Sequence, residues 1–395
     1  IAEMHQAIAA RAFDASGPAA VPARAMHDTI SAGVYAALRG GAHVAGRGAA
    51  LAVSATGAGE AELSSSAKGA AALAVVNGLI GDELEREGNE LQQPLAVRAD
   101  GRPVALESVL LAEAFPVARP RLVVFLHGLM ETEFAWRIGA GETRETYATR
   151  LRRDLDVTPV EVRYNSGRHI SENGRSLADV LERLVAAWPV EVEQIALIGH
   201  SMGGLVARSA CHQASADGAA WVKRVHHVIS LGSPHLGAPL AQGVHVAAAA
   251  LRALPETRPF GNFLGRRSGG IRDLRHGSLV DGDWRDCDPD ALRAAALAEV
   301  PLLPGATHCF VAATITHSPR HPLGRLLGDA LVLNGSASGR SRTRRIPFRA
   351  EDGFELGGAH HLALLNHPAV YERLRDWLST PPRAVRQAGE LSTPA

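Results

Sequence analysis

The stretch from residue 195 to residue 203 carries the clearest chemistry in the sequence. An apolar run of strand length, 195–198, leads directly into the motif G-x-S-x-G, whose serine is Ser201, and a helix-like run begins near Gly204. This order of strand, motif and helix is typical of a nucleophile elbow, in which a sharp turn lifts the serine clear of a sheet. Gly199 and Gly203 leave room for the strained backbone of that turn. We expect Ser201 to be a nucleophile; the alternative is a glycine-rich turn with an unreactive serine.

A serine hydroxyl is a weak nucleophile until a base accepts its proton, and a carboxylate must orient that base. In the α/β-hydrolase arrangement the three residues follow the order Ser, Asp or Glu, His. The histidines nearest the end of the chain are His360, His361 and His367. The first two lie in a glycine-softened loop that could return over the elbow, whereas His367 adjoins Pro368 at a helix start and is expected to cap it. We favour His361 as the base, with His360 as the alternative.

Asp329 is the expected acid, because it follows a predicted strand at 309–313 and precedes the candidate histidines. Asp352, Glu351 and Glu355 are closer in sequence to His361, but they lie in a charged segment that we expect to be exposed. Five more aspartates are expected to form a solvated acidic loop, because their spacing does not match an EF-hand: Asp281, Asp283, Asp286, Asp288 and Asp290.

Acyl transfer also needs two backbone donors for the oxyanion. The amide of Met202, directly after the nucleophile, is expected to be one of them. The other should come from the loop after the first buried strand, 122–126, where Gly128 allows the backbone to turn an amide inward. We assign this second donor to Leu129. Ordinary packing is the alternative role for the Leu129 side chain.

The elements that must position these residues alternate between strands and helices. Apolar runs predict strands at 122–126, 159–164, 194–198, 226–231 and 309–313, and a hairpin turns at Asp100-Gly101. Apolar residues at helical spacing predict a helix over 177–188 and a closing helix over 368–378. Such alternation predicts an α/β fold with a mostly parallel sheet covered on both faces.

Four regions are predicted along the chain. Residues 1–90, in which Met26, Ile30, Val34 and Leu38 form one stripe, are expected to be helices packed on the core; a lid or a membrane-surface element is the alternative. The core itself comprises 91–238 and 305–380. The insertion 239–304 is long for a connection in a compact domain, and we interpret it as a helical cap over the active site. Residues 381–395 form a tail.

Composition excludes several classes of function. The 395 residues carry no formal net charge, with 41 basic and 41 acidic side chains, which argues against a nucleic-acid partner. No apolar run reaches the length of a membrane span. The 18 histidines show no zinc-ligand spacing, so neither a metal nor a cofactor is predicted. Three scattered cysteines favour a reducing, cytoplasmic compartment, while a start on Ile1 leaves a secreted or periplasmic location as the alternative.

The sequence resembles bacterial lipases and esterases of the α/β-hydrolase fold, and within them the branch similar to GPI inositol-deacylases. The resemblance covers roughly 120–378 and rests on five stretches: F-L-H-G-L (125–129), G-H-S-M-G-G-L-V-A-R (199–208), L-G-S-P-H-L-G-A-P (231–239), G-D-A-L-V (328–332) and H-x-x-L-L-x-H-P (361–368). It implies Asp329 as the acid and His361 as the base, by the family's spacing. Ala330 stands where such lipases have a glycine.

The resemblance and the residues together predict a serine carboxylic-ester hydrolase that works through an acyl-enzyme, without a cofactor. Its substrate would be an acyl lipid, a small ester or a polyester, and a peripheral contact with a lipid interface is compatible with the sequence. An acyltransferase or a thioesterase would use the same triad. A non-catalytic binding protein on a hydrolase scaffold is the alternative from outside the enzymes.

Overall fold

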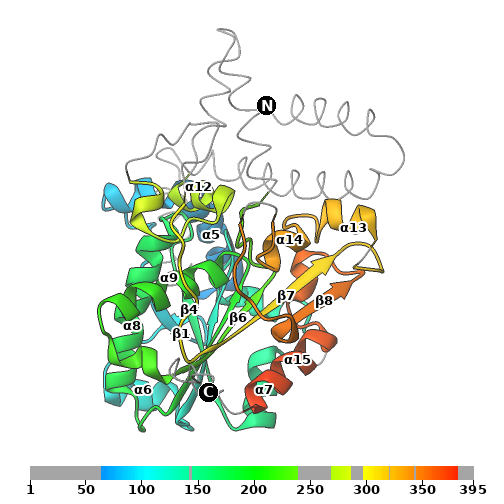
Figure 1. The fold of residues 1–395 in the computed structure, drawn as a ribbon. Helices are drawn as coiled ribbons and strands as arrows, with labels where there is room; N and C mark the ends of the chain where they lie inside the picture. The colour runs from blue at the N-terminus through cyan, green and yellow to red at the C-terminus, as the bar shows by residue number, and fades with distance from the viewer. Residues whose placement is uncertain are drawn as a thin grey trace, which may run out of the picture. The chain divides into compact units, whose positions relative to one another are not determined.

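The computed structural model describes residues 64–141, 145–238, 268–285, 297–319, 321–341 and 344–380 (Figure 1). Its strands form one sheet in the order β2-β1-β4-β3-β5-β6-β7-β8. Strands β3 to β8 run parallel to one another. Strand β1 runs antiparallel to both of its neighbours, β2 and β4. The strands are β1 (Ala96–Ala99), β2 (Arg102–Pro103), β3 (Arg121–Leu126), β4 (Thr158–Arg163), β5 (Gln194–His200), β6 (Val225–Leu231), β7 (Thr307–Thr314) and β8 (Gly353–Gly357).

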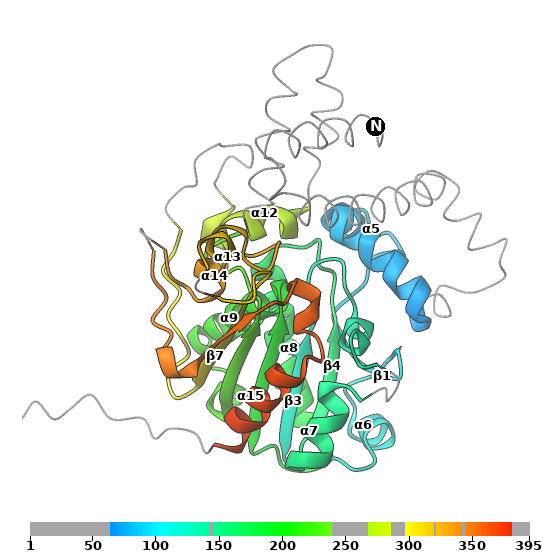
Figure 2. The same cartoon turned by 90° about the vertical axis from the view of Figure 1, so that its right-hand side faces the viewer.

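Helices cover both faces of the sheet, so the strands are buried on each side. One apolar core joins one face of the sheet to α6 (Ser108–Ala114), α8 (Ile170–Ala187) and α9 (Met202–Ala216). The other core joins the opposite face to α7 (Tyr147–Leu155) and α15 (Pro368–Ser379), which lie in front of the strands in Figure 2. The remaining α-helices are α5 (Ala67–Arg86), α12 (Gly269–His276), α13 (Pro322–Leu327) and α14 (Asn334–Ala337). Short 3₁₀ helices are η2 (Glu133–Arg137), η3 (Ala220–Arg224), η4 (Asp281–Asp283), η5 (Ala350–Asp352) and η6 (His361–Leu364).

The register of the parallel strands brings their carboxyl ends to one edge. Leu126 pairs with Gly199, and His200 pairs with Leu231. The loops that leave β3, β5 and β6 therefore begin side by side. In open α/β sheets, ligands bind at this carboxyl edge.

A buried ion cluster fixes the chain just beyond β3. Both oxygens of Glu133 face the guanidinium of Arg163 on β4, at 2.6 and 2.5 Å, and Arg98 on β1 approaches the same carboxylate at 3.5 Å. Glu133 and Arg163 are almost fully buried, so the bidentate geometry must offset the cost of removing both charges from water. The cluster ties η2 to the neighbouring strands.

The predicted layered sheet is confirmed, and each predicted strand is present with ends shifted by up to three residues. Strand β8 was not predicted, because it is short, flanked by glycines and half-exposed at the edge of the sheet. The expectation that the charged segment there is exposed is correct for Glu351 and Glu355 but wrong for Asp352, which is buried in η5. The stripe at residues 26–38 lies outside the described residues, and the four predicted regions stay a prediction.

The expectation of a solvated acidic loop is wrong for Asp283, whereas Asp281 is partly exposed. Asp283 is buried and accepts backbone N–H bonds from Leu279 at 2.8 Å and Ala298 at 2.8 Å. Asp281 accepts from the Ser171 hydroxyl on α8 at 2.6 Å. Asp283 thus joins Leu279 to Ala298, and Asp281 joins η4 to α8; Asp286, Asp288 and Asp290 lie outside the described residues.

Candidate active site

Ser201 occupies the turn between β5 and α9 in a backbone conformation that residues with a side chain rarely adopt, with φ 52° and ψ −119°. Its N–H donates to the carbonyl oxygen of Leu231 at 2.8 Å, which fixes the turn against the end of β6. A Cβ atom on Gly199 would overlap the start of the helix, and one on Gly203 would overlap the carbonyl oxygen of Leu126. The two glycines of the motif are therefore required sterically.

Asp329 and His361 are joined by two hydrogen bonds, and two more fix the Asp329 carboxylate. The ring Nδ1 of His361 lies 2.7 Å from Oδ2 of Asp329, and the His361 backbone N–H donates to the Asp329 carbonyl oxygen at 3.0 Å. The other carboxylate oxygen, Oδ1, accepts from the N–H groups of Leu331 and Val332 at 3.0 and 2.8 Å. Burial lowers the pKa of His361, but the carboxylates of Asp329 and Glu131 together raise it more, so the net pKa is above the usual value.

The His361 ring lies beside the end of β6, where the elbow is anchored. Gly232 follows Leu231 with φ 61°, and a Cβ atom there would be 3.2 Å from the ring of His361. Since Leu231 accepts the hydrogen bond of Ser201, the structure brings Ser201, Asp329 and His361 to the same edge of the sheet.

The alternative acids and bases are not part of this group. His360 is exposed, and His367 caps α15 by accepting the N–H of Ala369 at 3.2 Å, as expected. Glu355 points from β8 into solvent, and Asp352 lies in η5 before that strand. The carboxylate that contacts the His361 ring is that of Asp329.

The loop after β3 is held in shape by a neutral histidine. His127 is fully buried, and burial lowers its pKa to about 4. Its Nε2 accepts the backbone N–H of Tyr164 at 3.1 Å, so the hydrogen sits on Nδ1 and is donated to the Gly128 carbonyl oxygen at 2.8 Å. The rings of His127 and Tyr164 stack with centroids 4.2 Å apart.

Both predicted oxyanion donors have amides without an internal acceptor in the described part of the chain. Met202 is the first residue of α9, where an N–H has no partner within the helix. Leu129 lies in the loop between Gly128 and Met130, and its neighbours' amides are engaged while its own is not: Gly128 N donates to Glu131 at 2.7 Å and Met130 N to Ser166 Oγ at 3.0 Å.

Helix α5, from residue 77 onward, supports the same loop. Met130 has φ 58°, and its side chain fills the place that a Cβ on Gly78 would need. Gly81 is in equally close contact with the side chain of Asn165, whose amide donates to the Gly81 carbonyl at 2.9 Å. Ser268 donates to the Gly78 carbonyl oxygen at 2.6 Å. Gly78 and Gly81 thus allow α5 to approach the loops at the carboxyl edge of the sheet closely.

The described part of the predicted cap packs onto these loops. Gly270 of α12 packs closely on the carbonyl oxygen of Ser166. A Cβ atom at this position would overlap that oxygen and would lie 3.0 Å from the Met202 side chain. Asp273 of α12 accepts the Ile170 N–H at 2.7 Å and contacts His169 at 3.0 Å. These bonds attach α12 to the start of α8.

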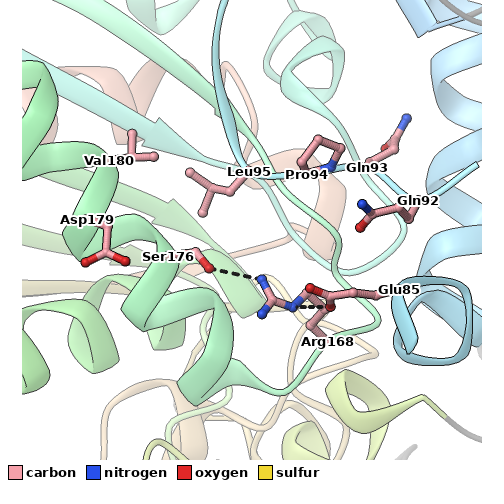
Figure 3. Close-up of a pocket in the computed structure, with 9 residues that line it drawn as sticks. All are labelled: Glu85, Gln92, Gln93, Pro94, Leu95, Arg168, Ser176, Asp179 and Val180. Carbon is pink, nitrogen blue, oxygen red and sulfur yellow. Dashed lines mark hydrogen bonds and ion pairs between the residues drawn. The ribbon is translucent and has the colours of Figure 1, made fainter. Parts of the chain in front are cut away.

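A separate cavity of about 270 Å³ lies between α5, the segment before β1, and α8 (Figure 3). Arg168 reaches into it, with Nε 2.5 Å from Glu85 and one terminal nitrogen donating to Ser176 Oγ at 3.0 Å. Burial raises the pKa of Glu85 even though Arg168 opposes this. The cavity is lined by none of the predicted site residues, so its polar groups are not part of the triad's chemistry.

Two site residues were not anticipated from the sequence, Glu131 and His200. Glu131 Oε2 lies 3.0 Å from His200 Nδ1, directly beside the nucleophile position. The motif gave the position of His200 but no reason to pair it with a carboxylate. In the described ranges no three His, Cys, Asp or Glu side chains gather as metal ligands would. None of the helices described there is long and apolar enough to cross a bilayer.

Comparison with known proteins gives one family match. The family model of the PGAP1-like alpha/beta domain matches residues 120–251. No curated protein matches the chain.

Several solved structures are similar to this chain at low identity. The mature lipase of Bacillus licheniformis is 20% identical with a TM-score of 0.41, over 65% of this chain and 91% of that one. An esterase of Pyrobaculum calidifontis is 14% identical with a TM-score of 0.38, over 77% and 90%. A metagenomic carboxyl esterase is 16% identical with a TM-score of 0.37, over 66% and 75%. Residues 120–251 are thus similar to the PGAP1-like alpha/beta domain family, and strands β3 to β6 of this region lie in a mostly parallel sheet.

Proposed function

We propose that the chain is a serine carboxylic-ester hydrolase with Ser201, His361 and Asp329 as its triad. The observation that carries the proposal is the Asp329–His361 pair, at 2.7 Å, lying at the sheet edge that also holds the strained serine turn. These residues come from loops far apart in sequence. A buried histidine with a carboxylate on Nδ1 has its other ring nitrogen available to accept a proton, which is the role of the base in such triads.

In the proposed mechanism His361 Nε2 accepts the Ser201 proton while Oγ attacks the ester carbonyl carbon. Asp329 keeps the hydrogen of His361 on Nδ1 and stabilises the imidazolium that forms. The amides of Leu129 and Met202 would bind the negative oxygen of the tetrahedral intermediate. Proton return from His361 to the departing alcohol leaves the acyl group on Ser201, and water then releases it by the same steps in reverse.

The first test is hydrolysis of p-nitrophenyl esters from acetyl to palmitoyl, with Ser201→Ala beside the wild type. We expect a loss of at least ~10³ in kcat, because the nucleophile and base act as one unit. Ser215→Ala, on the exposed side of α9, is the matched control and should keep wild-type rates. A Ser201→Ala rate close to that of the wild type would contradict the proposal.

Covalent labelling separates the remaining possibilities. A fluorophosphonate probe should label the wild type and leave Ser201→Ala unlabelled. Labelling with hydrolysis faster for thioesters than for oxygen esters would make the enzyme a thioesterase. Labelling with preferred transfer to an added alcohol would make it an acyltransferase, and no labelling at all would favour a binding role.

A further inference from the structure

Glu131 joins two parts of the site through one oxygen atom. Its Oε2 accepts the Gly128 N–H at 2.7 Å and faces His200 Nδ1 at 3.0 Å. Gly128 immediately precedes Leu129, which supplies a proposed oxyanion amide, and His200 immediately precedes Ser201. The Glu131 side chain is 14% exposed and that of His200 is fully buried, so water competes little for these bonds.

The contact continues from His200 to the proposed base. The rings of His200 and His361 have centroids 4.7 Å apart, and His200 Nε2 lies 3.4 Å from the His361 carbonyl oxygen. Because a carboxylate only accepts, the hydrogen on Nδ1 of His200 is fixed by Glu131. The orientation of the ring that packs against His361 therefore depends on Glu131.

The charge of Glu131 also acts on His361. Burial raises the pKa of Glu131, but His200 and the Gly128 N–H outweigh it, so the net pKa is below the usual value and the group is ionised at neutral pH. For His361, burial lowers the pKa, Asp329 raises it, and Glu131 raises it further. Within the described residues, Asp329 and His200 contact His361, and Glu131 acts on its pKa from behind His200. His127 also lowers the pKa of Glu131, and its own pKa of about 4 keeps it neutral at neutral pH.

We propose that Glu131 is a positioning residue for the proposed reaction: its carboxylate fixes both the oxyanion loop and the His200 ring that packs against the base. The inference rests on the proposed function. It adds a second carboxylate to the site, which reaches His361 through His200 and touches no reacting atom.

Two substitutions separate the charge of Glu131 from its reach. Glu131→Gln keeps the length and removes the charge, and its amide oxygen can take the place of Oε2 and accept both hydrogen bonds. Glu131→Asp keeps the charge but is one methylene shorter. Glu133→Gln, two residues further on and paired with Arg163, is the matched control for loss of a buried carboxylate from this segment.

The experiment measures kcat and KM for p-nitrophenyl butyrate between pH 5 and 9 on the full chain. We expect Glu131→Asp to lower kcat about tenfold to a hundredfold with little change in KM, because the shorter side chain no longer holds the oxyanion loop and one misplaced oxyanion donor costs up to ~10²–10³. Its acid limb of kcat/KM should stay near the wild-type position, because the charge is kept. In Glu131→Gln the acid limb should move to lower pH, because loss of the charge lowers the pKa of His361.

The outcomes are distinguishable. If Glu131→Asp lowers only the thermal midpoint, as Glu133→Gln should, and leaves kcat unchanged, while Glu131→Gln leaves the acid limb unchanged, Glu131 is merely structural and the inference is overturned. A histidine NMR titration, with His361→Ala for assignment, reads the same coupling without turnover. If the wild type hydrolyses no ester but the His361 pKa is lower in Glu131→Gln, the proposed function is overturned and the coupling between Glu131 and His361 stands. If the His361 pKa is unchanged in Glu131→Gln, the coupling is overturned.

Discussion

Replacing Asp329 by asparagine tests the triad most directly, because the structure dictates how the new side chain must sit. The N–H groups of Leu331 and Val332 both donate to Oδ1, and only an oxygen can accept them. The asparagine oxygen therefore takes that position and its NH₂ group faces Nδ1 of His361. Nδ1 must then accept, which moves the ring hydrogen to Nε2 and prevents Nε2 from accepting the Ser201 proton.

The expected loss is large. A wrong tautomer of the base lowers kcat by about 10³–10⁴, which corresponds to ~4–5 kcal/mol of transition-state stabilisation. The asparagine oxygen still accepts the two backbone N–H groups, so the fold around position 329 is kept. We therefore expect the thermal midpoint to change much less than it would if ~4–5 kcal/mol were lost from the free energy of unfolding.

The assay is steady-state hydrolysis of p-nitrophenyl butyrate with active-site titration by a fluorophosphonate, so that folded and reactive fractions are counted. Asp352→Asn is the matched control, because Asp352 is a buried acid that the sequence left as an alternative. We expect this control to stay within about threefold of the wild type. Activity of Asp329→Asn within tenfold of the wild type, or a larger loss in Asp352→Asn, would refute the reasoning.

Four further outcomes are expected. The wild-type kcat/KM should fall on the acid side with an apparent pKa above 6.5, since Asp329 and Glu131 together outweigh burial at His361; a midpoint below 6 in a pH–rate profile would contradict this. Ala330→Gly should raise the midpoint by about 1–4 °C in calorimetry, because Ala330 has φ 81°, a left-handed conformation that costs ~1–2 kcal/mol against the ~0.5–1 kcal/mol of extra glycine entropy. Burial raises the pKa of Glu161 to about 7, so the folded state holds its proton and stability is lost as pH rises from about 4.3 to 7; Glu161→Gln should raise the midpoint at pH 8 but not at pH 4. Asn366→Ala should lower the free energy of unfolding by about 2–4 kcal/mol in urea titration, because it loses bonds to Trp136, Ile138 and Tyr147.

The sequence could indicate the proposed nucleophile because its requirements are local: the strand, the glycines and the helix that form the turn are consecutive with Ser201. Position along the chain favoured Asp329 and His361 among several acids and three histidines, and the resemblance supported both. The structure adds an Asx-type turn at Asp329 that position could not predict, in which Ala330 keeps the left-handed conformation that a glycine would adopt.

What the sequence could not reveal depends on contacts between distant segments. Glu131 is an ordinary acid in a loop until β3 and β5 pair and place it beside His200. Asn366 looks like a loop residue, yet its buried amide joins the His361 loop to η2 and α7. Strand β8 has only two large apolar residues among five, Phe354 and Leu356, which is too few to show a period; its place in the sheet depends on the pairing with β7.

The backbone of Ser201 has a consequence for how this chain can evolve. A left-handed, strained residue stores roughly 1–3 kcal/mol that glycine would release, so Ser201→Gly should fold more stably than the wild type. The same change would remove the hydroxyl that we propose as the nucleophile. Selection for thermal stability alone would therefore discard this serine, and its presence in a turn that disfavours it is maintained only where activity is selected as well.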